Sequence, residues 1–149
     1  MSTPATATLN EVMAAIADQL RAQLEATVDG VQVEPRMLFN PTPPCLDIYP
    51  GDPFLLQTAM GVASREAMFV VRARVSTADS EGGQELLLDL LDPRAPTSVL
   101  AALDVDRTFA GAVQDSAVAD GPSGYILYAD PGGNQSLLGC EWRIQVILP

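Results

Sequence analysis

Asp47 and Asp52 form the first pair of side chains whose type and spacing could do chemistry. Both stand near the end of a predicted strand, where two carboxyl groups could act as acid and base on a glycosidic bond. In a chain with 19 acidic residues, such pairs arise on loops by chance. The pair therefore carries little weight as a catalytic site.

A second acidic run has the outline of a calcium-binding loop. Asp104-Val-Asp106 opens the run, and Asp115 stands at its twelfth position. However, Phe109 occupies the place where the sharp turn of such a loop needs glycine, and Ala112 brings no ligand at the ninth position. The sequence favours a solvated acidic turn over a calcium site.

Histidine and lysine are absent from the sequence. Without His there is no Ser-His-Asp triad and no imidazole base, and without Lys there is no Walker A loop and no Schiff base. The Gly-rich loop Pro131–Asn134 lies between two predicted strands, which favours a hairpin turn over a phosphate cradle. We therefore expect a protein that is not an enzyme and that has no metal or other cofactor.

Two cysteines, Cys45 and Cys140, are too few for a disulfide framework, and without histidine they cannot complete a zinc site. We expect two buried free thiols that behave as small apolar residues. A bond between them stays open at this point, because the sequence does not give their separation.

Two arginines, Arg72 and Arg74, alternate with apolar residues in the predicted strand Met68–Thr77, so they lie on one face of it. One interpretation is that they pair with acidic neighbours on the same face of the sheet. The other is that they contact the acidic surface of an identical neighbouring subunit. The pattern does not decide between the two.

Composition limits the partners of the chain. With 149 residues and 48% hydrophobic content, the sequence predicts a single domain, residues 1–149, with a substantial core. The net charge of −11 opposes non-specific binding to nucleic acid or anionic lipid. No run approaches the roughly 20 apolar residues of a membrane-spanning helix, and the N-terminus lacks the pattern of a secretion signal. We expect a protein made in a cytoplasm, with no membrane contact.

An amphipathic helix is predicted from Leu9 to about Val28. Its apolar residues recur on one face, Thr8 can cap its start and Gly30 can stop it. Residues 1–8, which are small and polar, are expected to be frayed.

The stretch Ser80–Leu103 predicts a pair of helices. The first begins just after Ser80, which caps it, and is stopped by Pro93. The second starts at Thr97 or Ser98. Leucines spaced three and four residues apart give the pair an apolar face for packing on a sheet.

Alternating apolar residues and Pro/Gly-rich turns predict six strands, and Phe54–Ala63 is expected to be a loop. The expected strands are Val31–Leu38, Cys45–Tyr49 (ended by P-G-D-P), Met68–Thr77, Ala112–Ala119, Gly124–Ala129 and Leu137–Leu148. The order of helix, strands, helix pair and strands predicts an α+β fold. Its sheet should be mixed and largely antiparallel, with the N-terminal helix and the helix pair on one face.

One long stretch, Q-E-L-L-L-D-L-L-D-P-R-A-P-T-S-V-L-A-A-L-D-V-D-R-T-F-A-G-A-V-Q-D, resembles the tail terminator proteins of long-tailed bacteriophages, especially those of actinobacteria. In that family a similar helix runs into an L-D-P-x-x-P-x-S-V segment and then an A-L-x-x-D turn. The strand with Gly-Cys-Glu-Trp-Arg-Ile also looks like the closing strand of the family. The resemblance extends from Leu9 to Leu148.

This resemblance implies a structural virion protein at the head-proximal end of the tail, assembled in the host cytoplasm. Such proteins form a ring, usually a hexamer, that ends growth of the tail tube. The implied partners are other copies of the chain, the major tail tube protein and the head-side connector or stopper protein, with DNA only passing through. The loops Asn40–Pro44, Pro50–Ser64 and Asp130–Ser136 are the expected contact segments. The expected interface residues are Arg72, Arg74, Pro43, Pro44, Asp52, Phe54 and Asn134.

Two other functions stay open. Another head–tail connector, minor tail or tail-completion protein has the same size and fold type. A small acidic bacterial binding or immunity module would also lack catalytic residues.

Overall fold

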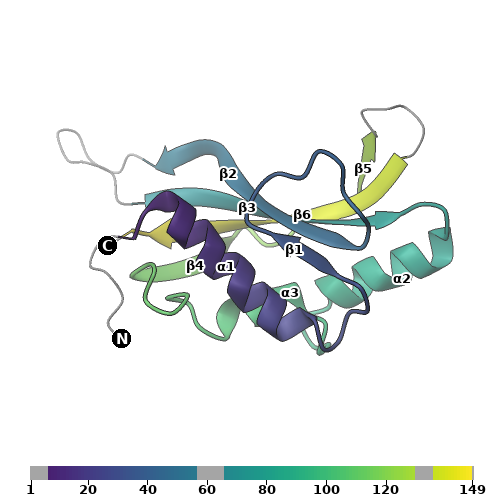
Figure 1. Ribbon diagram of the computed structural model, residues 1–149, viewed down its shortest axis with the longest axis horizontal. Coiled ribbons are helices and arrows are strands. Elements are labelled where there is room, and N and C mark those ends of the chain that lie inside the picture. Colours follow the sequence, from purple (N-terminus) through teal and green to yellow (C-terminus); the bar gives the residue numbers. More distant parts are fainter. Residues whose placement is uncertain (1–6, 57–65, 130–135, 149) are drawn as a thin grey trace.

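The computed structural model describes residues 7–56, 66–129 and 136–148. In that part of the chain, three helices lie against one face of a mixed sheet, and the segment between β1 and β2 arches over the other face (Figure 1). The expected α+β fold, with the helices on one face, is confirmed.

Helix α1, Leu9–Leu24, begins as predicted. The hydroxyl of Thr8 accepts from the N–H of Glu11, whose carboxylate accepts in turn from the N–H of Thr8, so two free donors are satisfied. The regular helix ends at Leu24 rather than near Val28, and a turn leads to Gly30 at φ +69°. Thr8 is thus ordered, contrary to the fraying expected for residues 1–8, of which 1–6 lie outside the described residues.

Helices α2, Ser80–Leu91, and α3, Val99–Asp104, form the predicted pair. The cap of α2 is Asp79 and not Ser80, because the Asp79 carboxylate accepts from the N–H of Gly82 at 3.0 Å. A carboxylate is also favoured at the positive end of the helix dipole. Ser98 caps α3, as one of the two predicted candidates.

The sheet has the strand order β1-β2-β3-β6-β4. Strand β5 pairs with the same edge of β6 as β4 does, but with a different part of it. Among the described strands, β1 and β2 run parallel and the other pairs are antiparallel. The strand bounds are β1 Gln32–Glu34, β2 Cys45–Leu56, β3 Glu66–Ser76, β4 Asp115–Ala119, β5 Ile126–Ala129 and β6 Ser136–Ile147.

Strand β2 corrects the prediction most. It was expected to end at Tyr49 before P-G-D-P, yet it continues to Leu56, so residues 54–56 are strand and not loop. Pairing with β3 stops after Pro50 and resumes at Leu55 with a shifted register. The prolines interrupt the hydrogen-bonded ladder because they lack N–H donors, but they do not end the extended backbone. Residues 57–63 of the expected loop lie outside the described residues.

The core lies between the helices and the covered face of the sheet. Trp142 and Phe69 fill its centre from β6 and β3, and Leu20, Leu87 and other helix residues close it. In β3, the predicted division holds, because the residues alternating with Arg72 and Arg74 are the ones that enter this core. Burial of these apolar side chains is the main force holding the helices on the sheet.

Candidate functional site

A cluster of charged side chains lies on the face of the sheet opposite the helices. Strand pairing places Asp47 of β2, Arg72 of β3 and Glu141 of β6 side by side in one row, with Arg74 one pleat further along β3. Arg72 binds Asp47 through two nitrogens, with 3.0 Å from Nε to Oδ1, and a terminal nitrogen of Arg74 lies 3.1 Å from Asp47 Oδ2. We call Asp47, Arg72, Arg74 and Glu141 the charge cluster.

Three of its members are withdrawn from water, and the fourth, Glu141, is half-buried. The Asp47 side chain is 0% exposed, and those of Arg72 and Arg74 are 12% and 7% exposed. Two carboxylates and two guanidinium groups give the cluster a formal charge of zero. A buried carboxylate is tolerated when charge-assisted hydrogen bonds replace its water, as the two arginines do for Asp47.

Two tyrosines enclose the guanidinium of Arg72. Its Cζ lies 5.0 Å from the ring centre of Tyr49 and 5.3 Å from that of Tyr128, within cation–π range, and the Tyr128 hydroxyl donates to Glu141. Gly139 makes room for Tyr128, because a Cβ there would lie 2.8 Å from its ring. Burial and the nearby Glu141 raise the pKa of Tyr49 to about 12, and burial with the Glu141 hydrogen bond also raises the pKa of Tyr128.

The guanidinium of Arg72 is held charged. Burial lowers the pKa of Arg72, but the hydrogen bonds and negative charge of Asp47 outweigh that effect, so the pKa is raised. This arrangement stabilises a fixed ion pair between Arg72 and Asp47.

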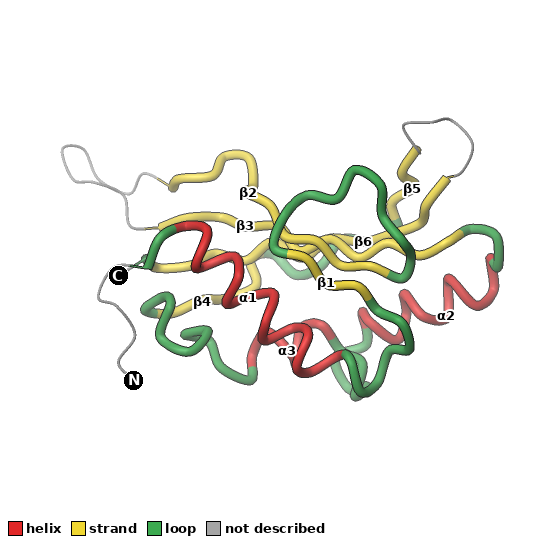
Figure 2. The backbone as a smooth tube through the Cα atoms, viewed as in Figure 1, coloured by secondary structure: helices red, strands yellow, loops and turns green. Residues whose placement is uncertain are grey.

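The charge cluster ties down the loop between β1 and β2. Asp47 Oδ2 accepts from the N–H of Leu38 at 2.9 Å, and a terminal nitrogen of Arg74 donates to the Leu38 carbonyl at 3.1 Å. Both backbone polar groups of one loop residue, Leu38, are thereby anchored on the sheet. The flanking side chains point outward, with Met37 40% and Phe39 71% exposed. We call residues 35–44 the anchored loop (Figure 2).

Arg72 and Arg74 therefore show the first of the two interactions that the sequence allowed, pairing with an acidic neighbour on the same face. A role of either arginine in a subunit contact stays a prediction. Asp47 and Asp52 do not share a working site, because Asp47 is saturated by two arginines while Asp52 is exposed.

The other predicted interface residues are spread over the molecule. Pro43 and Pro44 line a shallow depression of about 150 Å³ against the start of α2. Phe54 is half-buried, and its ring meets that of Phe69 edge to face at 5.2 Å, which makes it a support of the core. Asn134 lies outside the described residues.

The run that resembled a calcium loop is a turn held by its own side chain. Asp106 accepts from the N–H groups of Thr108 and Ala110, and hydrogen bonds from Thr108 and Ala110 lower the pKa of Asp106. Within residues 7–56, 66–129 and 136–148, no three His, Cys, Asp or Glu side chains gather as metal ligands would.

The two cysteines are buried free thiols, as predicted. Cys45 pairs with Arg74 across the ladder and Cys140 pairs with Ala73, so the thiols lie on opposite faces of the sheet. That placement settles the question of a bond between them.

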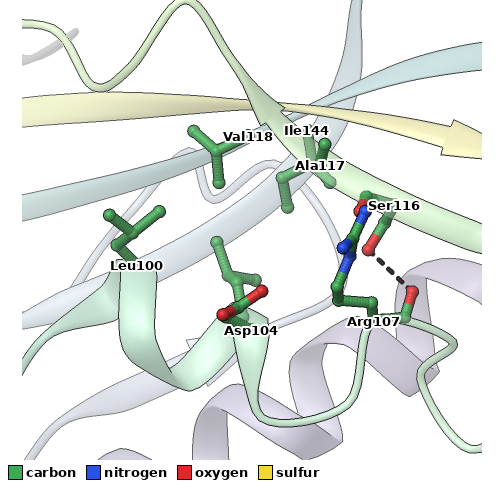
Figure 3. Close-up of a pocket in the computed structure, with 8 residues that line it drawn as sticks. Leu100, Asp104, Arg107, Ser116, Ala117, Val118 and Ile144 are labelled. Atoms are coloured by element: carbon green, nitrogen blue, oxygen red, sulfur yellow. Dashed lines mark hydrogen bonds between the residues drawn. The ribbon is translucent and has the colours of Figure 1, made fainter.

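A pocket of about 260 Å³ opens at the other edge of the sheet, between α3 and β4 (Figure 3). Leu100 and Leu103 of α3 face Val118 of β4 and Ile144 of β6 across it, and Asp104 and Arg107 stand at its rim. Arg107 is fixed there, because its Nε donates to the carbonyl of Ser116 at 2.9 Å and its own carbonyl accepts from the Ser116 hydroxyl.

Sequence reasoning missed three features of these sites: the role of Asp47, the exposure of Phe39 and the pocket. A signal existed for the first, since an acidic residue inside a predicted strand facing two alternating arginines is a natural ion-pair partner. None existed for the other two, which depend on how the loop and α3 sit on the sheet.

No helix in the described part of the chain is both long enough and apolar enough to cross a membrane. A scan against protein-family models and a search of curated proteins both find no match to the chain.

Proposed function

We propose that this chain is a structural protein of a bacteriophage tail, of the tail terminator type. In this proposal it forms a ring, with six copies as the expected number, on the last ring of the tail tube. The ring stops growth of the tube and offers its other side to the head-side connector, and DNA only passes through. The resemblance of the stretch Gln84–Asp115 to that family supports the identity.

One observation carries the assembly part of the proposal: a loop that is fixed at its centre exposes two large apolar side chains. Because Leu38 is bound through both its N–H and its carbonyl, Met37 and Phe39 are held toward solvent. An ordered contact loop loses less conformational entropy on binding than a flexible one. Exposed apolar side chains presented in this way are typical of a protein contact.

The charge balance favours a protein partner over nucleic acid. The chain has a net charge of −11 and eight arginines. Two of these, Arg72 and Arg74, are buried in ion pairs with Asp47 and do not add positive charge to the surface. Phosphate binding needs clustered cations on the surface. The same net charge makes the copies repel each other, so assembly should strengthen as added salt screens the repulsion.

Sedimentation velocity of the purified chain at about 10 mM and about 150 mM salt tests this proposal. The expected result is a closed species of about six times the 15.8 kDa chain mass, more populated at the higher salt. A strict monomer under both conditions would contradict ring assembly.

A second experiment separates a terminator from another connector protein. The chain is added to a phage tail tube protein that polymerises in vitro, and tube lengths are measured by negative-stain microscopy. A terminator shortens the tubes and appears as a cap on one end. Rings that form in solution but leave tube length unchanged would instead support the connector alternative.

A further inference from the structure

Two of the outer strands of the sheet, β1 and β4, each have a backbone carbonyl that is occupied by an arginine side chain. On β1, a terminal nitrogen of Arg21 donates to the carbonyl of Val33. On β4, Arg107 Nε donates to the carbonyl of Ser116. An arginine that occupies an edge carbonyl blocks the ladder through which a neighbouring strand would add. These two hydrogen bonds disfavour addition of a strand from another copy at the edges formed by β1 and β4.

The anchored loop and the pocket are complementary in shape. A cavity of about 150 Å³ lined by aliphatic side chains suffices to bind benzene. The pocket between α3 and β4 has about 260 Å³ and a largely aliphatic lining, which leaves room for one phenyl ring. Phe39, 71% exposed on the anchored loop, is the most exposed large hydrophobic side chain among the described residues.

Their charges are complementary as well. Arg36, three residues before Phe39, has a side chain that is 69% exposed, and its contact with Glu34 is loose, at 3.6 Å. Asp104, at the rim of the pocket, is exposed and free to accept an arginine from a neighbour. Opposite charges beside an apolar anchor fix the orientation of a contact more than they add affinity.

Phe39 cannot reach the pocket of its own chain. The anchored loop lies on the face of the sheet opposite the helices, near β1 and β2, whereas the pocket lies on the helix face at β4. Four strand spacings separate β1 from β4, about 19 Å. A contact between these two surfaces therefore joins different copies head to tail, which gives a ring when the rotation closes.

We propose that Phe39 of one copy inserts into the pocket between α3 and β4 of the next copy, with Arg36 directed at Asp104. This inference rests on the proposed function and names the contact between ring subunits. Phe39 acts as the central anchor of the interface, and the anchored loop supplies the surrounding contacts.

Cysteine pairing tests the contact. Arg36→Cys in one preparation is mixed with Asp104→Cys in another under mild oxidation, so that Phe39 is kept, and crosslinked species are measured by non-reducing electrophoresis. The native thiols Cys45 and Cys140 are buried, so we expect them to form no crosslinks in this assay. The expected result is a crosslink in the mixture and none in either preparation alone, because a head-to-tail contact never brings two copies of one surface together.

The matched control replaces Asp104→Cys by Leu88→Cys, on the exposed side of α2. An equal crosslink yield with Leu88→Cys, or crosslinking of Arg36→Cys with itself, would overturn the proposal. Phe39→Asp should also raise the concentration needed for assembly by roughly 30-fold, the effect of losing a central anchor. Rings that form equally well with Phe39→Asp overturn this contact and leave the proposed function standing. An open filament that depends on Phe39 supports the contact and overturns the ring, and a wild-type chain that never associates overturns both.

Discussion

The two faces of the sheet are built on different principles. On the helix face, Trp142, Phe69 and their neighbours are covered by helices and held by burial of apolar surface. On the loop face, Asp47 is buried equally well, but it is held by charge-assisted hydrogen bonds to two arginines. Apolar packing tolerates exchange of similar shapes, whereas a buried ion pair depends on each partner. The loop face thus tolerates fewer substitutions than the helix face, but its ion pairs fix the loop at Leu38.

The largest expected effect comes from removing the shared acceptor. Asp47→Ala removes the carboxylate that binds both Arg72 and Arg74 and leaves the cluster with an excess of positive charge, and we expect the free energy of unfolding to fall by about 3–5 kcal/mol. Urea denaturation followed by circular dichroism measures the loss. The control is Asp52→Ala on the same strand, where the side chain is exposed and little change is expected. If the two variants were equally stable, the charge cluster would not hold the loop face.

Conservative exchanges sharpen the comparison between the faces. Arg72→Lys keeps the positive charge but loses the two-nitrogen contact with Asp47 and the planar stack between the tyrosines, and we expect a loss of about 1.5–3 kcal/mol. Leu90→Met on the helix face keeps volume and polarity and should cost less than about 1.5 kcal/mol. Both are measured by the same denaturation. A Leu90→Met variant that loses more stability than Arg72→Lys would reverse the comparison.

A further expected effect appears only at alkaline pH, and it involves both faces. Burial raises the pKa of Cys140 on the helix face and, together with Glu141, that of Tyr49 on the loop face, in each case to about 12. Both groups are neutral when protonated, so folding holds their protons more tightly than the unfolded chain does. Their contribution is complete below the ordinary pKa values of about 9 and 10 and is lost as the pH rises toward 12.

The urea midpoint should therefore be constant from pH 7 to about pH 8.5 and should fall above that. The chain has three tyrosines, so the difference in tyrosinate absorption between the wild type and Tyr49→Phe gives the titration of Tyr49. A Tyr49→Phe variant should lose part of the alkaline fall. A midpoint that rises with pH would contradict the burial of these groups.

The sequence predicts the helix face well, because local signals determine it. Thr8 and Ser98 are visible as caps, and the alternation in β3 and β6 already separates core residues from Arg72 and Arg74. The side chains of Asp79 and Ser80 can both accept hydrogen bonds from the N–H groups at the start of α2. In the structure Asp79 is the cap, and the sequence alone does not distinguish the two.

The loop face is harder to predict, because its contacts are distant in sequence. Asp47 and Arg72 are paired by the register of β2 on β3. The sequence does not give this register, because β2 runs past Pro50 and its pairing with β3 shifts there. Leu38 is anchored by side chains from two strands. The exposure of Phe39 follows from that anchoring, so composition and periodicity give no sign of it.

Hydrogen exchange at the Leu38 amide, followed by NMR, tests the central claim most directly, because this N–H donates to Asp47 rather than to a strand. The account predicts that the Leu38 amide is protected in the wild-type chain. Protection should be lost in Arg74→Met, which keeps Asp47 paired with Arg72 but frees the Leu38 carbonyl, while the amides between β3 and β6 stay protected. A Leu38 amide that exchanges as fast in the wild type as in Arg74→Met would contradict the claim that the charge cluster holds the loop.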